Sequence, residues 1–283
     1  MDCTGFLHWA MPLLRLRWEG YRKVHRQVCR RLASRMEELG LPAFSAYKAY
    51  LKGNPGEWLV LDSLCGITIS RFYRDCGVFD AMRTRLLPSL AADILRAGGK
   101  EVLCWSAGCA SGEEPYTLQI IWRAGVVPAT GRDIPLRIIA TDVNEELLER
   151  ARRCCYPESS LRDLPGRFRE AFVRCDNGYS VREIFRENVE FLRQDIRRQL
   201  PEGTFHLILC RNLAFTYFDE GLQWETLGRV MTKLMPGGIL VIGRRESLPD
   251  RVAGINPVSG TTAIFQKETS GMSGDSDSES HLL

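Results

Sequence analysis

The sequence lacks most features that mark membrane proteins and metalloproteins. It holds only four histidines, and its ten cysteines follow no zinc-ligand spacing that histidines complete, so we predict no metal site. Its apolar runs are short: Phe6 to Leu16 contains His8 and Pro12 and has neither the basic start nor the cleavage site of a signal peptide. We therefore expect a cytoplasmic protein with reduced thiols and no direct membrane insertion.

A large net charge is also absent. The 38 lysines and arginines exceed the 35 acidic residues by only three, which argues against a nucleic-acid partner. The excess is uneven, because residues 1–50 hold nine basic side chains against four acidic ones. This segment is either a docking face for an acidic partner or an ordinary solvated helix face. At 283 residues, the chain has room for one large domain and a smaller one.

The dinucleotide fingerprint G-x-G-x-x-G is missing from the turn around which the chain is organised. Val102 to Trp105 predicts a buried parallel strand, Gly108 and Gly112 permit a tight turn, and Glu113 and Glu114 begin a helix. Two carboxylates at a helix start would repel a pyrophosphate. They suit a cationic ligand such as S-adenosylmethionine, although a plain glycine turn with solvated glutamates is the alternative.

Hydrophobic periodicity predicts helices before this turn and alternating strands and helices after it. Val24, Val28, Leu32 and Met36 form the stripe of an amphipathic helix from Tyr21 to Gly40. An Asn-Gly pair in Cys175 to Gly178 predicts a hairpin inside a small β excursion. The other expected helices are 44–51, 58–65, 113–122, 144–152 and one ending near Leu234, and the expected strands are 136–142, 189–192, 205–210, 239–242 and 261–266.

Polar residues follow the predicted strands at their carboxyl ends, where ligands bind in doubly wound α/β sheets. Asp142 ends the strand after the glycine turn and is placed to accept hydrogen bonds from ribose hydroxyls, in either class of adenosine cofactor. Asp195, Arg211 and Asn212 follow later strands. The stretch from Thr68 to Asp75 mixes hydroxyls, aromatics and arginines, so some of its side chains are expected to line a site.

These motifs together resemble the CheR-type chemotaxis receptor methyltransferases over roughly residues 20–266. The strongest match is W-S-A-G-C-A-S-G-E-E-P-Y at 105–116, followed by A-T-D-V-N at 140–144, C-R-N-L at 210–213 and M-P-G-G-I-L at 235–240. The resemblance implies an α/β class I S-adenosylmethionine-dependent methyltransferase with a Rossmann-like doubly wound sheet. The domains expected are a helical N-terminal docking domain with its linker (1–85), a methyltransferase domain (86–267) with an inserted β-subdomain (about 155–188), and a disordered acidic tail (268–283).

The resemblance also implies roles for individual residues. Glu114 would meet the methionine part of the cofactor, Asp142 the ribose, and Asp195 with Ile196 the adenine. Thr68 and Asp195 stand where the family commonly has asparagine, and Arg244-Arg245 replaces a His-Ser pair. The implied cofactor-binding residues are Thr68, Ser70, Arg74, Gly108, Glu114, Asp142, Asp195, Ile196, Asn212 and Leu213, and the implied catalytic residues are Arg74 and Tyr217.

The activity implied is methyl transfer from S-adenosylmethionine to protein glutamates, giving γ-glutamyl methyl esters and S-adenosylhomocysteine. The partner implied is the cytoplasmic region of a chemoreceptor-like protein, and we expect a monomer. The alternatives are methylation of another protein or small molecule, because substrate-facing segments depart from the family, and a non-catalytic regulator that binds S-adenosylmethionine.

Overall fold

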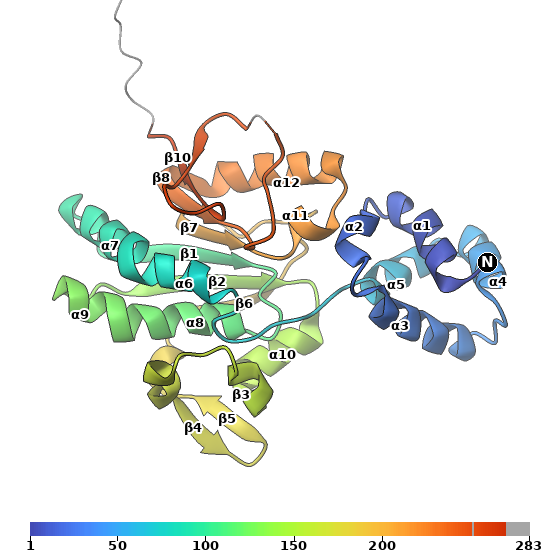
Figure 1. Ribbon diagram of the computed structural model, residues 1–283, viewed down its shortest axis with the longest axis horizontal. Coiled ribbons are helices and arrows are strands. Elements are labelled where there is room, and N and C mark those ends of the chain that lie inside the picture. The colour runs from blue at the N-terminus through green and yellow to red at the C-terminus, as the bar shows by residue number, and fades with distance from the viewer. Residues whose placement is uncertain (251, 270–283) are drawn as a thin grey trace, which may run out of the picture.

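The computed structural model describes residues 1–250 and 252–269, which form two lobes joined by a linker (Figure 1). The predicted acidic tail lies outside the described residues from position 270 onward. A helical lobe comes first and an α/β domain follows. The helices of the first lobe are α1 (Cys3–Leu13), α2 (Trp18–Tyr21), α3 (His25–Glu38), α4 (Phe44–Gly53) and α5 (Glu57–Leu64).

The predicted amphipathic helix is present, but a turn divides it. The chain turns at residues 22–24, between α2 and α3, and Gly40 follows the end of α3 with a φ of +65°. Val28, Leu32 and Met36 of the predicted stripe are buried. The predicted helices at 44–51 and 58–65 are confirmed as α4 and α5.

Helix α1 was not predicted from the sequence, and one of its cysteines forms a disulfide that was not expected. The apolar residues of this run form one face of α1, and that face packs on the rest of the lobe through residues such as Phe6 and Met11. A disulfide joins Cys3 of α1 to Cys29 of α3, so the expectation that all thiols are reduced is wrong for this pair. Spacing along the chain could not show the pairing, because packing of two helices brings these residues together across a sequence separation of 26.

The expected doubly wound sheet has seven strands in the order β6-β2-β1-β7-β8-β10-β9. Neighbouring strands from β6 to β8 are parallel, whereas β10 is antiparallel to both β8 and β9. Leu234 begins β8 and is not the last stripe position of a helix, because α12 ends at Lys233. The strands are β6 (Val189–Arg193), β2 (Leu136–Asp142), β1 (Val102–Ala107), β7 (Phe205–Cys210), β8 (Leu234–Val241), β10 (Ile264–Lys267) and β9 (Ile255–Pro257), the last of which was not predicted.

The helices that follow the strands begin at recognisable caps. Asn144 and Asp219 accept hydrogen bonds from the first turns of α10 and α12, and Gly112 precedes α8 with a φ of +88°. A Cβ atom on Gly112 would lie 2.8 Å from the Cβ of Ala151, so glycine also permits close packing there. The helices of this domain are α6 (Cys76–Ala81), η1 (Met82–Leu86), α7 (Leu87–Arg96), α8 (Glu113–Ile121), η2 (Trp122–Val126), α9 (Val127–Thr130), α10 (Glu145–Arg153), α11 (Ala214–Tyr217) and α12 (Glu220–Lys233).

The predicted β excursion is a separate three-stranded antiparallel sheet, which lies below the main sheet in Figure 1. Its hairpin turns at the predicted Asn-Gly, between β4 (Phe172–Cys175) and β5 (Gly178–Val181). The remaining elements are β3 (Cys155–Tyr156), η3 (Glu158–Leu161), η4 (Gly166–Ala171) and η5 (Glu183–Phe185). In the part of the chain that the structure describes, no helix is both long enough and apolar enough to cross a membrane.

Candidate functional site

The carboxyl ends of β1, β2 and β7 lie side by side, and they bring the predicted site residues together. Ala107 is level with Thr141 on one side and with Cys210 on the other. The next residue, Gly108, has a φ of +73°, and a Cβ atom there would lie 2.7 Å from a methyl carbon of Leu213. Glycine therefore allows the turn after β1 to pack directly against the turn after β7.

Asp142 is held at the end of β2 by the backbone of two adjacent turns. Its Oδ2 accepts the amide of Ala110 at 2.8 Å, and its Oδ1 accepts the amide of Asn144 at 3.0 Å. Burial raises the pKa of this carboxyl, and the backbone hydrogen bonds oppose the shift. Each oxygen keeps one further acceptor position, so the carboxylate can still receive two hydroxyl groups.

The two glutamates of the acidic turn are not solvated. Glu113 is only 2% exposed and accepts a hydrogen bond from Ser111 at 2.9 Å. Glu114 accepts from Ser106 at 2.7 Å and from Arg211 at 2.9 Å, and its side chain is 14% exposed. The alternative of a plain turn with solvated glutamates is therefore wrong.

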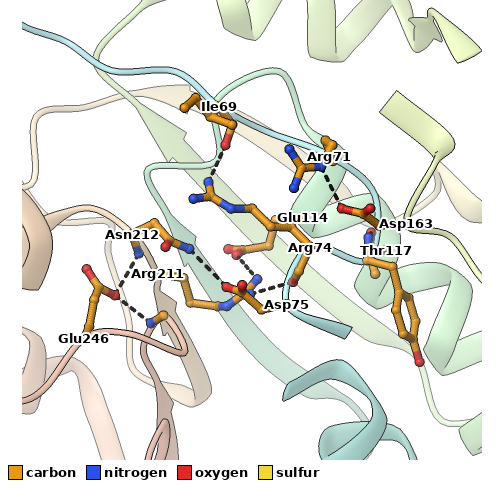
Figure 2. Close-up of polar contacts among 12 residues, drawn as sticks. Ile69, Arg71, Arg74, Asp75, Glu114, Thr117, Asp163, Arg211, Asn212 and Glu246 are labelled. Carbon is orange, nitrogen blue, oxygen red and sulfur yellow. Dashed lines mark hydrogen bonds and ion pairs between the residues drawn. The ribbon is translucent and has the colours of Figure 1, made fainter. Parts of the chain in front are cut away.

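Arg211 joins three segments that are far apart in the sequence (Figure 2). Its buried guanidinium donates to Glu114, to Asp75 at 3.0 Å and to the carbonyl of Arg74 at 2.7 Å. The ring of Phe79 lies 4.7 Å from the guanidinium carbon. Arg211 belongs to the C-R-N-L motif, but no role for it could be predicted, because its partners come together only in the folded chain.

The linker from Gly66 to Asp75 carries the predicted hydroxyl and arginine residues across this end of the domain. Thr68 is exposed and Ser70 is half-buried. The linker is pinned by Arg71, which donates to Asp163 at 2.6 Å, and by the amide of Tyr73, which donates to Thr117 at 3.1 Å. Tyr73 and Asp75 have φ values of +60° and +62°, so their contacts hold backbone conformations that non-glycine residues adopt rarely.

Arg74 and Tyr217 act on each other electrostatically. Figure 2 shows the guanidinium of Arg74 turned toward the carbonyl of Ile69, to which it donates. Burial lowers the pKa of Arg74, with Asp75 opposing the shift, but an arginine stays charged at any working pH. Burial raises the pKa of Tyr217, and the positive charge of Arg74 opposes that shift.

The helical lobe packs against α11, which carries Tyr217. The ring of Tyr21 lies 4.9 Å from that of Tyr217, and Arg17 donates to the carbonyls of Phe215 and Thr216. A Cβ atom on Gly20 would lie 2.2 Å from the Thr216 carbonyl oxygen, so only glycine fits this contact. The position of the predicted catalytic tyrosine thus depends on a different lobe.

Asn212 is fixed by a buried carboxylate that the sequence analysis missed. Glu246 is 8% exposed and accepts hydrogen bonds from the amide of Asn212 at 2.8 Å, the amide of Gly243 at 2.6 Å and the hydroxyl of Thr216 at 2.6 Å. Asn212 has a φ of +55°, and a Cβ atom on Gly243 would lie 2.9 Å from its side-chain oxygen. The available signal was the residue's place at the end of G-R-R-E, after β8.

Asp195 and Ile196 lie in the loop after β6. The backbone amide of the preceding Gln194 donates to the backbone carbonyl of Asp142 at 3.0 Å, which places this loop beside the predicted ribose position. Ile196 is buried. The carboxylate of Asp195 is bound by Arg197, whose hydrogen bonds lower its pKa although burial acts in the opposite direction.

Comparison with known proteins matches residues 68–264 to the family described as "CheR methyltransferase, SAM binding domain". The chain belongs to the CheR methyltransferase family. It is 29% identical to the chemotaxis protein methyltransferase of Borreliella burgdorferi, and the match covers 77% of this chain and 78% of that protein. It is 30% identical to the chemotaxis protein methyltransferase of Escherichia coli K12, and the match covers 78% of this chain and 76% of that protein. It is also 32% identical to a segment of an uncharacterised 104.1 kDa protein of Rhodobacter capsulatus, which it covers to 23%.

The donor and acceptor chemistry of the site fits the family's cofactor, S-adenosylmethionine. Asp142 keeps one acceptor position on each oxygen, which matches the two hydroxyls of a ribose. Glu114 uses one position on Ser106 and one on Arg211, and it keeps acceptor capacity for an ammonium group. The class I methyltransferase fold and the cofactor are confirmed, while the roles of individual residues stay predictions.

Proposed function

We propose that this CheR family methyltransferase modifies glutamate side chains of a chemoreceptor-like protein, forming γ-glutamyl methyl esters. The observation that supports the proposal is the contact set of Arg211, which binds Glu114, Asp75 and the carbonyl of Arg74 and so holds the acidic turn beside the linker that carries Arg74. Arg74 supplies a fixed positive charge for a carboxylate acceptor, and Glu114 supplies a negative charge for the cofactor. The two reactants would therefore be received on opposite sides of one site.

The acceptor needs orientation more than activation. A free glutamate has a pKa of about 4.3 and is ionised at neutral pH, so no general base is required. Bound S-adenosylmethionine supplies a methyl group on a sulfonium, ready for transfer to an oxygen nucleophile. The guanidinium of Arg74 would leave the Ile69 carbonyl and hold the incoming carboxylate by two parallel hydrogen bonds. Tyr217 would align the same carboxylate and exclude water from it.

The helical lobe, α1 to α5, with the linker that follows it, is the proposed docking unit for the receptor. Part of its basic excess is structural: Arg31 donates to the carbonyl of Leu64, and Arg35 pairs with Glu57. Another part is exposed, and we call it the basic face: Arg22, Lys23, Arg26 and Arg30. Receptor methylation regions present acidic helices, which this face would attract.

A different acceptor is the second candidate, and one observation favours it. Arg244 and Arg245 are exposed where the family resemblance implies His-Ser, and Arg244 lines a hollow of about 660 Å³ between α6 and the loop before β10. The residue before Arg244, Gly243, donates its amide to the same Glu246 carboxylate that accepts the amide of Asn212, so the hollow lies close to the candidate site. It could receive acceptor groups that the family pattern does not anticipate.

Labelled cofactor distinguishes these candidates. The protein is incubated with methyl-labelled S-adenosylmethionine and the cytoplasmic fragment of a candidate receptor, and the label is then treated with base. Methyl esters release the label as methanol, so base-labile label on the fragment supports the proposed function. Base-stable label would favour another acceptor, and cofactor binding without turnover would favour a regulator. A fragment with its methylation-region glutamates changed to alanine is the matched control.

We also propose a cell compartment and an oligomeric state for this protein. A cytoplasmic receptor region requires a cytoplasmic enzyme, and we propose that it acts as a monomer. The Cys3–Cys29 disulfide is unusual for that compartment, where thiols are normally kept reduced. Acid trapping of intact cells followed by alkylation tests the pair, and sedimentation of the purified protein tests the monomer.

A further inference from the structure

Arg197 lies between two carboxylates that belong to different lobes. Its Nη1 and Nη2 donate to the two oxygens of Asp62, in α5 of the helical lobe, at 2.9 and 2.6 Å. Its Nε and Nη2 donate to Asp195, in the loop after β6, at distances from 2.8 to 3.1 Å. A single guanidinium therefore connects the helical lobe to the loop that is predicted to meet adenine.

The connection is more shielded than an ordinary surface ion pair. The side chains of Arg197 and Asp62 are each 21% exposed and that of Asp195 is 17% exposed. Burial lowers the pKa of Arg197, but hydrogen bonds to Asp62 and Asp195 outweigh it and raise the pKa overall. Two-pronged, charge-assisted contacts of this kind fix geometry as well as contribute energy.

Arg197 also explains why an aspartate stands at position 195. Oδ1 of Asp195 accepts from the backbone amide and from Nε of Arg197, and Oδ2 accepts from Nε and Nη2. A carboxylate has about four acceptor positions, so this one residue takes up most of them. An asparagine at this position would present only one acceptor oxygen and could not match the guanidinium fork.

We infer that Arg197 is a positioning residue through which docking of the helical lobe sets the shape of the adenine end of the cofactor site. The inference deepens the proposed function and rests on it, together with the predicted placement of adenine at Asp195 and Ile196. The same loop continues from Gln194, whose amide binds the carbonyl of Asp142. A shift of the loop would thus reach both halves of adenosine.

Calorimetry with S-adenosylhomocysteine tests this coupling without any methyl acceptor. Asp62→Asn keeps the shape of the side chain but removes its charge, and we expect it to weaken binding about 5- to 10-fold, a usual size for coupling between sites. Arg197→Gln should weaken binding at least as much. The matched control is Glu38→Gln, which removes an exposed carboxylate that pairs with Arg35 inside the helical lobe, and its affinity should not change.

A double-mutant cycle separates coupling from general damage. In the Arg197→Gln background the connection is already broken, so Asp62→Asn should change the affinity by less than about twofold. Equal losses in both backgrounds would assign Asp62 an ordinary structural role and overturn the inference. So would a folded Asp62→Asn protein with wild-type affinity.

Hydrogen exchange provides a second measurement, because coupling between sites is reciprocal. S-adenosylhomocysteine should slow exchange of the α5 amides, residues 57–64, in the wild type but not in Arg197→Gln. Slowing of the same size in both proteins would contradict the role of Arg197. Failure of the proposed function would look different: the Asp62 effect would be present, but the receptor fragment would carry no base-labile label.

Discussion

The two ends of the candidate site are held in different ways. At the ribose end, Asp142 is bound by the backbone amides of Ala110 and Asn144, which the turns after β1 and β2 supply. At the acceptor end, Thr216, which precedes Tyr217, donates to the side chain of Glu246, which also accepts the amide of Asn212 and comes from beyond the next strand. The ribose end is thus a property of the sheet, whereas the acceptor end is a product of packing between separate segments.

The helical lobe makes the contrast stronger. Arg17 and Gly20 pack on the carbonyls of α11, and the ring of Tyr21 packs against that of Tyr217, so the predicted catalytic tyrosine is positioned from outside its own domain. A change in the helical lobe should therefore affect turnover more than ribose binding. The adenine end is the exception that the Asp62–Arg197 contact predicts.

The largest effect is expected for Arg211, because its guanidinium ties Glu114 of the acidic turn to Asp75 and to the carbonyl of Arg74 in the linker. Arg211→Met removes a guanidinium whose side chain is 2% exposed and leaves Glu114 and Asp75 without their partner. Breaking a buried pair in this way costs about 3 to 5 kcal/mol of the free energy of unfolding. Urea denaturation measures the loss. Arg152→Gln, which breaks an exposed pair with Glu145, is the control and should cost less than about 1 kcal/mol.

A mutation at Arg74 should separate the two ends. Arg74→Lys keeps the charge but loses the planar fork, so the acceptor carboxylate is aligned less well. We expect kcat and kcat/KM to fall together by roughly 10- to 1000-fold, equivalent to about 1.4 to 4 kcal/mol, with little change in cofactor affinity. Steady-state kinetics and calorimetry on one preparation check this. Wild-type turnover in a folded variant would remove Arg74 from the reaction.

Asp142 should show the opposite pattern. Asp142→Ala removes two hydrogen bonds from a charged group to the ribose, each worth about 1.5 to 3 kcal/mol before water compensates. We expect cofactor affinity to fall roughly 10- to 100-fold, because water offsets part of the loss, while the fold survives. Calorimetry measures the cofactor affinity, and circular dichroism checks that the variant is folded. Unchanged affinity in a folded protein would place the ribose elsewhere.

The same contrast explains which parts were predictable from the sequence. Gly108, Glu114 and Asp142 follow strands that local hydrophobic patterns reveal, so the sheet and this end of the site could be anticipated. The turn within the predicted helix 21–40 and the start of β8 at Leu234 were missed, because caps and sheet pairing override periodicity at element ends.

The remaining contacts left no local signal. Glu246 binds Asn212 across 34 positions, and Arg197 binds Asp62 across 135. Single charged residues like these are indistinguishable in sequence from solvated surface residues, because only the packing of segments far apart in the chain decides which become partners. The resemblance to a family supplied residue roles but not these contacts.

The smallest effect is expected on the basic face, and it should leave both ends of the site unchanged. Changing Arg22, Lys23, Arg26 and Arg30 to glutamine removes exposed charges, each worth at most about 1 kcal/mol in a surface contact. Receptor methylation should slow about fivefold at low ionic strength and much less at high salt, since screening already weakens the attraction in the wild type. Cofactor affinity should stay the same.

The control is a variant in which four exposed basic residues of the methyltransferase domain are changed to glutamine in the same way: Arg96, Lys100, Arg132 and Arg137. Equal salt dependence in the basic-face variant and the wild type would show that this surface is only a solvated helix face.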